Sequence, residues 1–578
     1  MMLGSSFLRA FSTALAFCSL ADAAALGLLT SRQACTNGPT TRDCWSAGYN
    51  INNDPDTSFP PGGQIRSYVF NVGRTTLNIA GVSRSMLTIN GQYPGPTINA
   101  NWGDTIRVTV KNTLTDNGTD IHWHGIRQLN TAIFDGTPGT TECPLAPGQQ
   151  RDYIFRATQY GTSWYHSHFP AQYSDGVVGP IVIAGPASAN YDIDLGAIPL
   201  TDWYHRSFFQ VAAAAKTASG PPTADTILIN GKNVGSSGGS YDLKTLTPGK
   251  KHLVRFINTG TNNYFHVSLD GHPFQVVAAD FNPIVPYTTT DLTLAIGQRF
   301  DVIINANQAT SNYWLRVRPG GAGCDGPVAV TEAKSIFRYT GAPANNPTST
   351  AYTISTGCTD ASFTMYRAQT VPNGNLALNP VQSIGFQGPT ATTPIFWTVN
   401  SSPLRVDWID PLLAKVRDGD TNYDPRENVR IVGNTGWTYW VVQQDITAGP
   451  RLPHPIHLHG HEYVTNLTQL IRRLGFYVIG QGTGSYSTAT LTYTNPIRRD
   501  TATLPANGYL IVAFKTDNPG AWLMHCHVAF HAEGGFGQSF LERAADYAAS
   551  ADFSQLAPVC NAWQTYSGGN QDPNEAGI

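Results

Sequence analysis

The chain contains the stretch Trp522-Leu-Met-His-Cys-His527, an aromatic, strand-like element whose outline occurs twice more upstream. The earlier copies are Trp164-Tyr-His-Ser-His168 and Trp314-Leu-Arg-Val-Arg318. A turn and an alternating strand precede each copy, at 147–155, 296–304 and 506–514. Each copy also has an upstream strand that ends in Asn, at 105–112, 252–258 and 428–434. Because the copies lie more than 100 residues apart, they indicate whole domains, and short strands between Gly, Pro, Asn and Asp predict Greek-key β-sandwiches.

The composition supports a large, mostly β protein. The 578 residues include 56 Gly and 38 Pro, which suits many turns, and only 13% are charged, about half the usual share. The formal net charge of −3 leaves no basic excess to bind phosphates, so we expect no nucleic-acid partner. No apolar run of about 18 residues follows the first thirty positions, so we expect no membrane-spanning helix and no membrane partner.

The first residues have the pattern of a secretory signal. Arg9 precedes an apolar run from Ala10 to Leu20, and Ala21-Asp-Ala23 follows as a cleavage pattern. This pattern predicts a signal peptide at 1–23, leaves open a short pro-segment to about residue 32, and indicates a secreted, extracellular protein. Segments rich in Pro, Ala, Ser, Thr and Asn set the predicted domain boundaries. The predicted domains cover 33–188, 189–365 and 366–578, and a helix is predicted at Leu541–Ala549.

The cysteine count fits an oxidising compartment. Cys18 lies in the predicted signal peptide and Cys526 lies between two histidines, which leaves six of the eight, enough for three disulfides. Six cysteines allow about 15 pairings. The favoured set has two local pairs and one distant pair: Cys35–Cys44, Cys324–Cys358 and Cys143–Cys560. Triplets that would accept N-linked glycans occur at Asn117, Asn400 and Asn466.

The histidines are strongly clustered. Eleven of the 15 lie in four windows, at 122–124, 166–168, 454–461 and 525–531. The windows contain four His-x-His pairs: His122/His124, His166/His168, His457/His459 and His525/His527. Residues i and i+2 of a strand share a face, so eight imidazoles could converge on a cluster of late first-row metals, with zinc as the alternative to copper. The middle repeat has Arg316 and Arg318 at the corresponding place and is predicted to be metal-free.

Cys526 favours copper over zinc. This one thiolate, with His454 upstream and His531 five residues downstream, supplies the His₂Cys set of a blue-copper electron-transfer centre. Phe536 stands where such sites often place a weak axial Met, and its side chain cannot bind a metal. Cys526 is also joined by peptide bonds to His525 and His527, which gives a short covalent route to the histidine cluster.

Together these motifs resemble those of the multicopper oxidases, and most closely those of the laccases of filamentous ascomycete fungi. The motifs are His122-Trp-His-Gly125, His166-Ser-His168, His454-Pro-Ile-His-Leu-His-Gly460 and His525-Cys-His-Val-Ala-Phe-His531. The resemblance implies an all-β chain of three consecutive cupredoxin-like Greek-key β-sandwich domains. It also implies four copper ions, with the type 1 site in domain 3 and a type 2 and two type 3 ions between domains 1 and 3.

The resemblance implies a ligand set for each ion. The type 1 set is His454, Cys526 and His531, and the type 2 set is His122 and His457. The two type 3 sets are His124, His166 and His527, and His168, His459 and His525. His461 matches no ligand, and two roles stay open for it: support of a ligand from behind, or a purely structural role.

The implied reaction is one-electron oxidation of small phenolic and related aromatic substrates, coupled to four-electron reduction of dioxygen to water by a monomeric enzyme. This reduction consumes protons, so an acid is required near the cluster. Asp135, in the Phe-Asp-Gly after the first motif, matches the family's acidic residue near the type 2 copper. Its alternative role is that of a turn aspartate before Gly136. Glu462, next to His461, is the other candidate acid.

One position departs from the family pattern. Many similar laccases have an acidic residue beside the type 1 pocket that accepts the phenolic proton, and the matching residue here is Asn262. Asparagine can hydrogen-bond a phenol but cannot take its proton near neutral pH. Three alternatives compete with a laccase: a ferroxidase would need carboxylates beside the type 1 site, an ascorbate oxidase would be expected to have Met in place of Phe536, and a copper-storage cupredoxin would tolerate loss of ligands.

Overall fold

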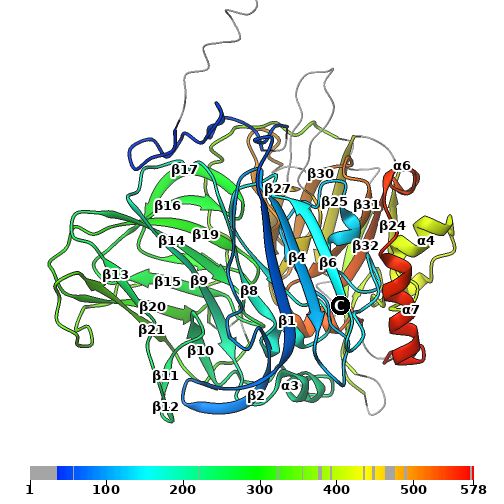
Figure 1. Cartoon of the computed structure of the whole chain (residues 1–578), viewed down its shortest axis with the longest axis horizontal. Coiled ribbons are helices and arrows are strands. Elements are labelled where there is room, and N and C mark those ends of the chain that lie inside the picture. Colours follow the sequence, from blue (N-terminus) through cyan, green and yellow to red (C-terminus); the bar gives the residue numbers. More distant parts are fainter. Residues whose placement is uncertain are drawn as a thin grey trace, which may run out of the picture.

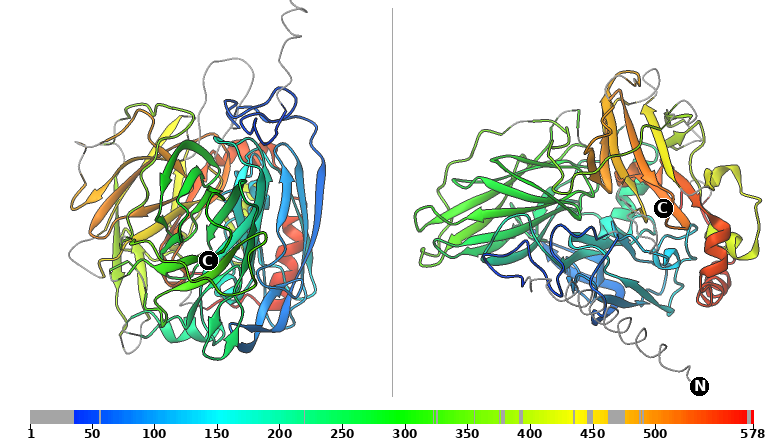
Figure 2. Two further views of the ribbon diagram at one scale, coloured as in Figure 1. Left: turned by 90° about the vertical axis from the view of Figure 1, so that its left-hand side faces the viewer. Right: turned by 90° about the horizontal axis from the view of Figure 1, so that it is seen from above.

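The computed structural model describes most of the chain after residue 35. The described residues are 36–578 except 56, 219, 322, 325, 355, 375, 377–379, 391–393, 434–435, 445–449, 462–475, 487, 489–490 and 573–575. The predicted signal peptide, Cys35, Glu462 and Asn466 lie outside the described residues. Three β-sandwiches follow one another along the chain and lie side by side, coloured blue to cyan, green, and yellow to red (Figures 1 and 2).

The first sandwich consists of two four-stranded sheets, ordered β2-β1-β4-β6 and β3-β8-β7-β5. The strands of the first sheet are β1 (Ile65–Ile79), β2 (Val82–Ile89), β4 (Thr105–Asn112) and β6 (Gln150–Arg156). Those of the second are β3 (Ile98–Asn101), β5 (His122–His124), β7 (Gly161–His166) and β8 (Val178–Ala184). In β4 the side chains of Ile106, Val108 and Val110 are buried while that of Arg107 is exposed, the alternation of a strand with one face on the core.

The second sandwich repeats this plan with longer sheets, ordered β10-β9-β14-β19-β16-β17 and β13-β21-β20-β15-β18. The first sheet contains β9 (Ile193–Trp203), β10 (Thr226–Ile229), β14 (Lys251–Asn258), β16 (Phe274–Ala279), β17 (Asn282–Thr289) and β19 (Arg299–Asn305). The second contains β13 (Leu243–Leu246), β15 (Phe265–Leu269), β18 (Leu292–Leu294), β20 (Asn312–Pro319) and β21 (Ala333–Tyr339), and a hairpin is formed by β11 (Val234–Gly235) and β12 (Gly238–Gly239). Arg316 of β20 pairs with Asp270, so the arginine at the histidine position is bound to a carboxylate.

The third sandwich has sheets ordered β23-β22-β25-β30-β27-β28 and β24-β32-β31-β26-β29. The first contains β22 (Val381–Gln387), β23 (Phe396–Val399), β25 (Trp437–Gln444), β27 (Phe476–Thr483), β28 (Ile497–Arg499) and β30 (Gly508–Lys515). The second contains β24 (Val429–Val432), β26 (His454–Leu458), β29 (Thr501–Leu504), β31 (Gly520–Cys526) and β32 (Gly537–Glu542). All seven residues of β31 are buried, because β26 and β32 flank it in the sheet and its side chains share a core with Ala132 and Ile133 of the first sandwich.

The predicted repeats are confirmed in two elements out of three. The 147–155, 296–304 and 506–514 segments lie in or run into β6, β19 and β30, which take equivalent places in their sheets, and the aromatic copies form β7, β20 and β31. The match of 428–434 to 105–112 is wrong. Residues 429–432 form β24, which pairs with β32 in the other sheet. The strand of the third sandwich that takes the place of β4 and β14 is β25.

Short helices fill the connections. They are η1 (Ala132–Phe134), α2 (Gln172–Asp175), α3 (Phe208–Ala215), α4 (Leu412–Asp418), η3 (Pro425–Glu427), α5 (Ala529–Glu533), α6 (Ala544–Ser550) and α7 (Leu556–Ser567). The helix predicted at Leu541–Ala549 starts too early, because Leu541 and Glu542 still pair with β31. No helix among the described residues is long and apolar enough to span a membrane.

Two predicted disulfides are present. Cys143–Cys560 ties α7 to the first sandwich, and Cys324–Cys358 closes a loop of the second. The remaining predicted bond, Cys35–Cys44, lies partly outside the described residues. Ala576 and Ile578 are buried, and the Val406 amide donates to the Ala576 carbonyl, so the last described residues pack between the first and third sandwiches.

Candidate metal centre

A cysteine and two histidines converge at the end of β26 and β31. His454 is the first residue of β26, Cys526 is the last of β31, and His531 lies on α5. The Cys526 Sγ lies 3.6 Å from the His454 Nδ1 and 3.5 Å from the His531 Nδ1, and the two Nδ1 atoms are 3.1 Å apart. Three ligand atoms therefore face one point.

The surroundings of this triad are aromatic and buried. Phe536 is fully buried, and its ring centroid lies 5.0 Å from that of His454. Trp397 contacts the rings of both histidines, at 4.8 and 4.3 Å. Burial lowers the pKa of His531 to about 3 and raises the pKa of the Cys526 thiol. A soft cation that replaces the thiol proton would offset that cost, so the triad fits copper.

Eight further histidines form a second cluster between the first and third sandwiches. β5 and β7 pair so that His122 faces His166, while β26 and β31 pair so that His457 faces His525. The two strand pairs meet face to face, since the His122 ring stacks on that of His459 and the His124 ring on that of His457, each at 3.8 Å. Tertiary packing thus joins motifs more than 300 residues apart.

The ligand atoms of this cluster point inward. The Nδ1 of His124 lies 3.2 Å from the Nε2 of His527, and the Nε2 atoms of His168 and His525 are 3.3 Å apart. Among the described residues, the buried imidazole nitrogens of this cluster without a hydrogen-bond partner are His122 Nε2, His166 Nε2, His168 Nδ1, His457 Nε2, His459 Nε2 and His527 Nδ1. Such orphaned lone pairs are rare in protein interiors, and they fit bound metal ions.

Burial lowers the pKa of most histidines of this cluster. It lowers the pKa of His525 to about 4, and with the neighbouring histidines it lowers the pKa of His124, His457 and His527 well below the ordinary value. Neutral imidazole is the form that binds a metal. Groups able to hold one ion include His454 with Cys526 and His531, and His168 with His459 and His525.

Asp135 lies behind the cluster, where the sequence placed it. Its Oδ2 is 2.8 Å from the Nδ1 of His459 and accepts from the Thr137 hydroxyl at 2.9 Å. Its main-chain oxygen accepts from the Nδ1 of His122 at 2.9 Å. His461 is also buried behind a ligand, with its Nδ1 2.7 Å from the His459 carbonyl and its Nε2 3.0 Å from Glu542.

Asp500 is a residue that the sequence analysis missed. Its Oδ1 lies 3.3 Å from the Nε2 of His124, and its main-chain oxygen accepts from the Nδ1 of His457 at 2.7 Å. Asp500 follows two arginines and belongs to none of the histidine windows, so only the pairing of β29 with β26 brings it to the cluster.

A cavity of about 200 Å³ opens beside His531. Its walls include Trp397 and Phe530, and Asn262 lies on it as predicted. The main-chain nitrogen of Asn262 donates to Asp202 at 2.9 Å, while its side-chain Nδ2 has no hydrogen-bond partner in the described part of the chain. A smaller cavity of about 30 Å³ is lined by residues of the histidine cluster and by the last described residue, among them His168, His525, Tyr173 and Ile578.

Three sandwiches, with one His₂Cys triad and an eight-histidine cluster between the first and third, define a cupredoxin-type protein that holds several copper ions. Three stretches match family models described as multicopper oxidase, at residues 71–188, 195–342 and 396–546. The chain belongs to the multicopper oxidases. Within that family it is an oxidoreductase of the laccase type, and the family implies four copper ions.

Several relatives support this placement. A laccase of Neurospora crassa is 44% identical over 546 residues, which cover 92% of this chain and 87% of that protein. Laccase-1 of Melanocarpus albomyces is 43% identical over 557 residues, which cover 93% and 88%. The crystal structure of a laccase from Botrytis aclada matches with a TM-score of 0.87 and 37% identity, covering 94% of this chain and all of that one.

Proposed function

We propose that the chain oxidises phenolic and related aromatic compounds beside His531 and reduces dioxygen to water at the eight-histidine cluster. The observation that carries this proposal is the position of Cys526. Its thiol belongs to the triad, while its sequence neighbours His525 and His527 belong to the cluster. Peptide bonds therefore connect an electron-accepting site at a cavity with a buried multi-metal site.

The ligand assignment is the one that the resemblance to the multicopper oxidases implies, and the ring nitrogens that stay free are compatible with it. His122 and His457 both donate from Nδ1 to a carbonyl, which leaves both Nε2 atoms for the type 2 ion. His124, His166 and His527 would hold one type 3 ion, and His168, His459 and His525 the other. His454, Cys526 and His531 would hold the type 1 ion, and the ring of Phe536, which cannot bind a metal, packs against that of His454.

Bound copper would supply the one-electron steps and the binding of dioxygen, and the chain supplies the surroundings. Asp135 holds the Nδ1 of His459 and is buried next to His122. We assign it the delivery of protons to the cluster, because its second carboxylate oxygen, Oδ1, lies 3.4 Å from the Nδ1 of His122 and has no hydrogen-bond partner among the described residues. Glu462, the other candidate acid, stays a prediction.

At the aromatic cavity Asn262 would orient a phenol. Its Nδ2 has no hydrogen-bond partner among the described residues, so it can donate to the phenolic oxygen, but it accepts no proton from the substrate. Trp397 and Phe530 give the cavity apolar walls, which suits an aromatic ring.

We further propose a secreted, monomeric glycoprotein. The disulfides of Cys143 with Cys560 and of Cys324 with Cys358 suit an oxidising compartment. Asn400 is exposed in a turn, in keeping with a glycan. Asn117 is the second described candidate, and Asn466 stays a prediction from the sequence.

Oxygen uptake by the copper-loaded protein tests the proposal. Three donors should be compared: a methoxyphenol, ferrous iron and ascorbate. We expect uptake with the phenol to exceed that with ferrous iron, and to require Cys526, so that Cys526→Ser consumes no oxygen. A preference for ferrous iron would indicate a ferroxidase, and no uptake with any donor would refute an oxidase.

A further inference from the structure

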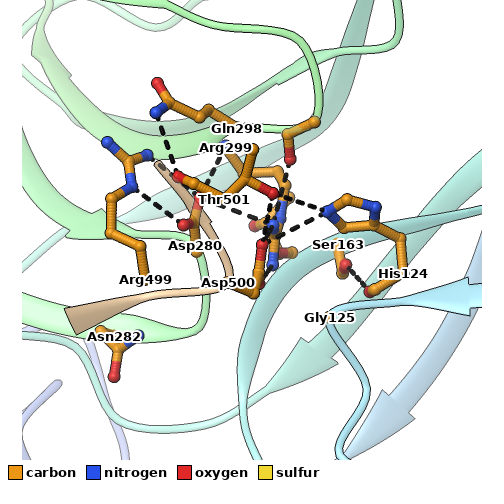
Figure 3. A network of polar contacts seen from close by, with 12 residues as sticks. His124, Gly125, Ser163, Asp280, Asn282, Gln298, Arg299, Arg499, Asp500 and Thr501 are labelled. Carbon is orange, nitrogen blue, oxygen red and sulfur yellow. Dashed lines mark hydrogen bonds and ion pairs between the residues drawn. The ribbon is translucent and has the colours of Figure 1, made fainter. Parts of the chain in front are cut away.

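The second sandwich contributes a side chain to the surroundings of the histidine cluster. Arg299, the first residue of β19, is fully buried, and its guanidinium forms two parallel bonds to Asp500 of the third sandwich (Figure 3). The Nη1–Oδ1 distance is 2.6 Å and the Nη2–Oδ2 distance is 2.7 Å. This fork geometry fixes a carboxylate in both position and plane.

The carboxylate held in this way touches a predicted copper ligand. The Asp500 Oδ1 lies 3.3 Å from the Nε2 of His124, and the Thr501 hydroxyl lies 3.3 Å from the same nitrogen and 3.0 Å from that Oδ1 (Figure 3). An ionised carboxylate only accepts hydrogen bonds, so Asp500 favours a proton on the Nε2. The Nδ1 of His124, which faces His527 at 3.2 Å, is then free to bind a metal.

Arg299 is itself fixed by further contacts, among them an ion pair with Asp280 at 3.5 Å. Its Nε donates to the Thr162 carbonyl of the first sandwich at 3.0 Å, and its Nη1 donates to the Gly297 carbonyl at 3.1 Å. The guanidinium therefore contacts all three sandwiches at once. The Asp500 side chain can rotate about two bonds, and this anchored guanidinium holds its carboxylate in one orientation toward His124.

We propose that Arg299 is a positioning residue of the trinuclear site: through Asp500 it selects the His124 tautomer whose Nδ1 faces the cluster. The metal-free sandwich thereby takes part in assembling the site between the other two. The inference rests on the proposed role of His124 as a copper ligand.

The test is Arg299→Lys in the copper-loaded protein, because lysine keeps the charge and loses the fork. Arg316→Lys is the matched control, since Arg316 makes a similar two-pronged contact with Asp270 within the second sandwich, with both distances at 2.8 Å. Anaerobic reduction of the blue centre by a phenol, reoxidation by dioxygen, and the electron paramagnetic resonance signal of the cluster should be measured for each.

In Arg299→Lys we expect the phenol to reduce the blue centre at the same rate as in the unmodified protein. Reoxidation by dioxygen should be ~10–100-fold slower, which is the usual effect of losing a partner of a metal ligand. The electron paramagnetic resonance signal of the cluster should also change. Arg316→Lys should match the unmodified protein in all three. Should Arg299→Lys not fold, Asp500→Asn tests the same contact and should show the same pattern.

Unchanged reoxidation and an unchanged cluster signal in the folded variant would overturn the inference, as would equal changes in both lysine variants. Failure of the proposed function is distinct, because the unmodified protein would then lack the blue centre or the reoxidation by dioxygen.

Discussion

Removing copper should make the protein sensitive to mild acid. Burial lowers the pKa of His531 to about 3 and that of His525 to about 4, from an ordinary value of 6.5. The unfolded chain therefore binds protons that the folded, metal-free chain excludes, and stability falls as the pH drops below 6.5. The loss ends near the folded pKa of each group, at about pH 4 for His525 and about pH 3 for His531.

The size of the effect follows from these shifts. At about 1.36 kcal/mol per pKa unit, full protonation of the unfolded chain lowers the free energy of unfolding by about 5 kcal/mol through His531 and by about 3 kcal/mol through His525. Between pH 6 and pH 4.5 the two together should lower the free energy of unfolding by about 2–3 kcal/mol per pH unit. Bound copper occupies the same nitrogens, so the loaded protein should show a much flatter pH dependence in this range.

Urea unfolding followed by tryptophan fluorescence, at several pH values, measures this slope. In the metal-free protein His531→Gln should flatten it by about 1.4 kcal/mol per pH unit. The control is His205→Gln, because that side chain is about a third exposed and lies near Asp225 rather than in a buried site. The reasoning would be refuted if the free energy of unfolding depended on pH with the same slope in the metal-free protein and in its His531→Gln variant. The same slope in the metal-free and the copper-loaded protein would refute it too.

Four substitutions probe single roles. Cys526→Ser should abolish the intense blue absorbance, which needs the thiolate, and a remaining band would contradict the triad. Phe536→Met should lower the potential of the blue centre in a redox titration by adding a weak fourth ligand; an unchanged potential would place another residue at the axial position. Asp135→Asn should slow reoxidation by dioxygen ~10²-fold with unchanged phenol-driven reduction in stopped-flow traces, and equal slowing of both would indicate misfolding instead. Asn262→Asp should raise kcat/KM for a phenol relative to a non-phenolic donor above the new carboxylate's pKa, and equal changes for both would remove Asn262 from the phenol site.

The sequence was sufficient for the strands that carry ligands. A His-x-His pair needs only the two-residue period of a strand to place both rings on one face. β5 contains both histidines of its pair, whereas β26 ends at Leu458, one residue before His459. The distant disulfide of Cys143 with Cys560 was also predicted correctly, because the local pairs left few alternatives. These features depend on short-range geometry or on counting.

Sheet membership could not be predicted in the same way. Residues 429–432 look like the 105–112 strand, yet they join the opposite sheet of their sandwich, where β32 is the hydrogen-bonding partner. Leu541 and Glu542 look helical by composition, but backbone pairing with β31 keeps them extended. In both places a long-range ladder decided between local alternatives of similar energy.

The contacts that orient the ligands were still less visible in the sequence. Arg299 and Asp500 are 201 residues apart and lie in different sandwiches, and neither stands at a fixed spacing from a histidine motif. A metal ligand needs a lone pair aimed at the ion and a partner for its other nitrogen. In this fold that partner comes from a different sandwich than the ligand does. Asp135 of the first sandwich supports His459 of the third. Arg299 of the second sandwich supports His124 of the first through Asp500. A sandwich without copper ligands can therefore be required for copper chemistry, since the trinuclear site depends on how all three sandwiches are docked.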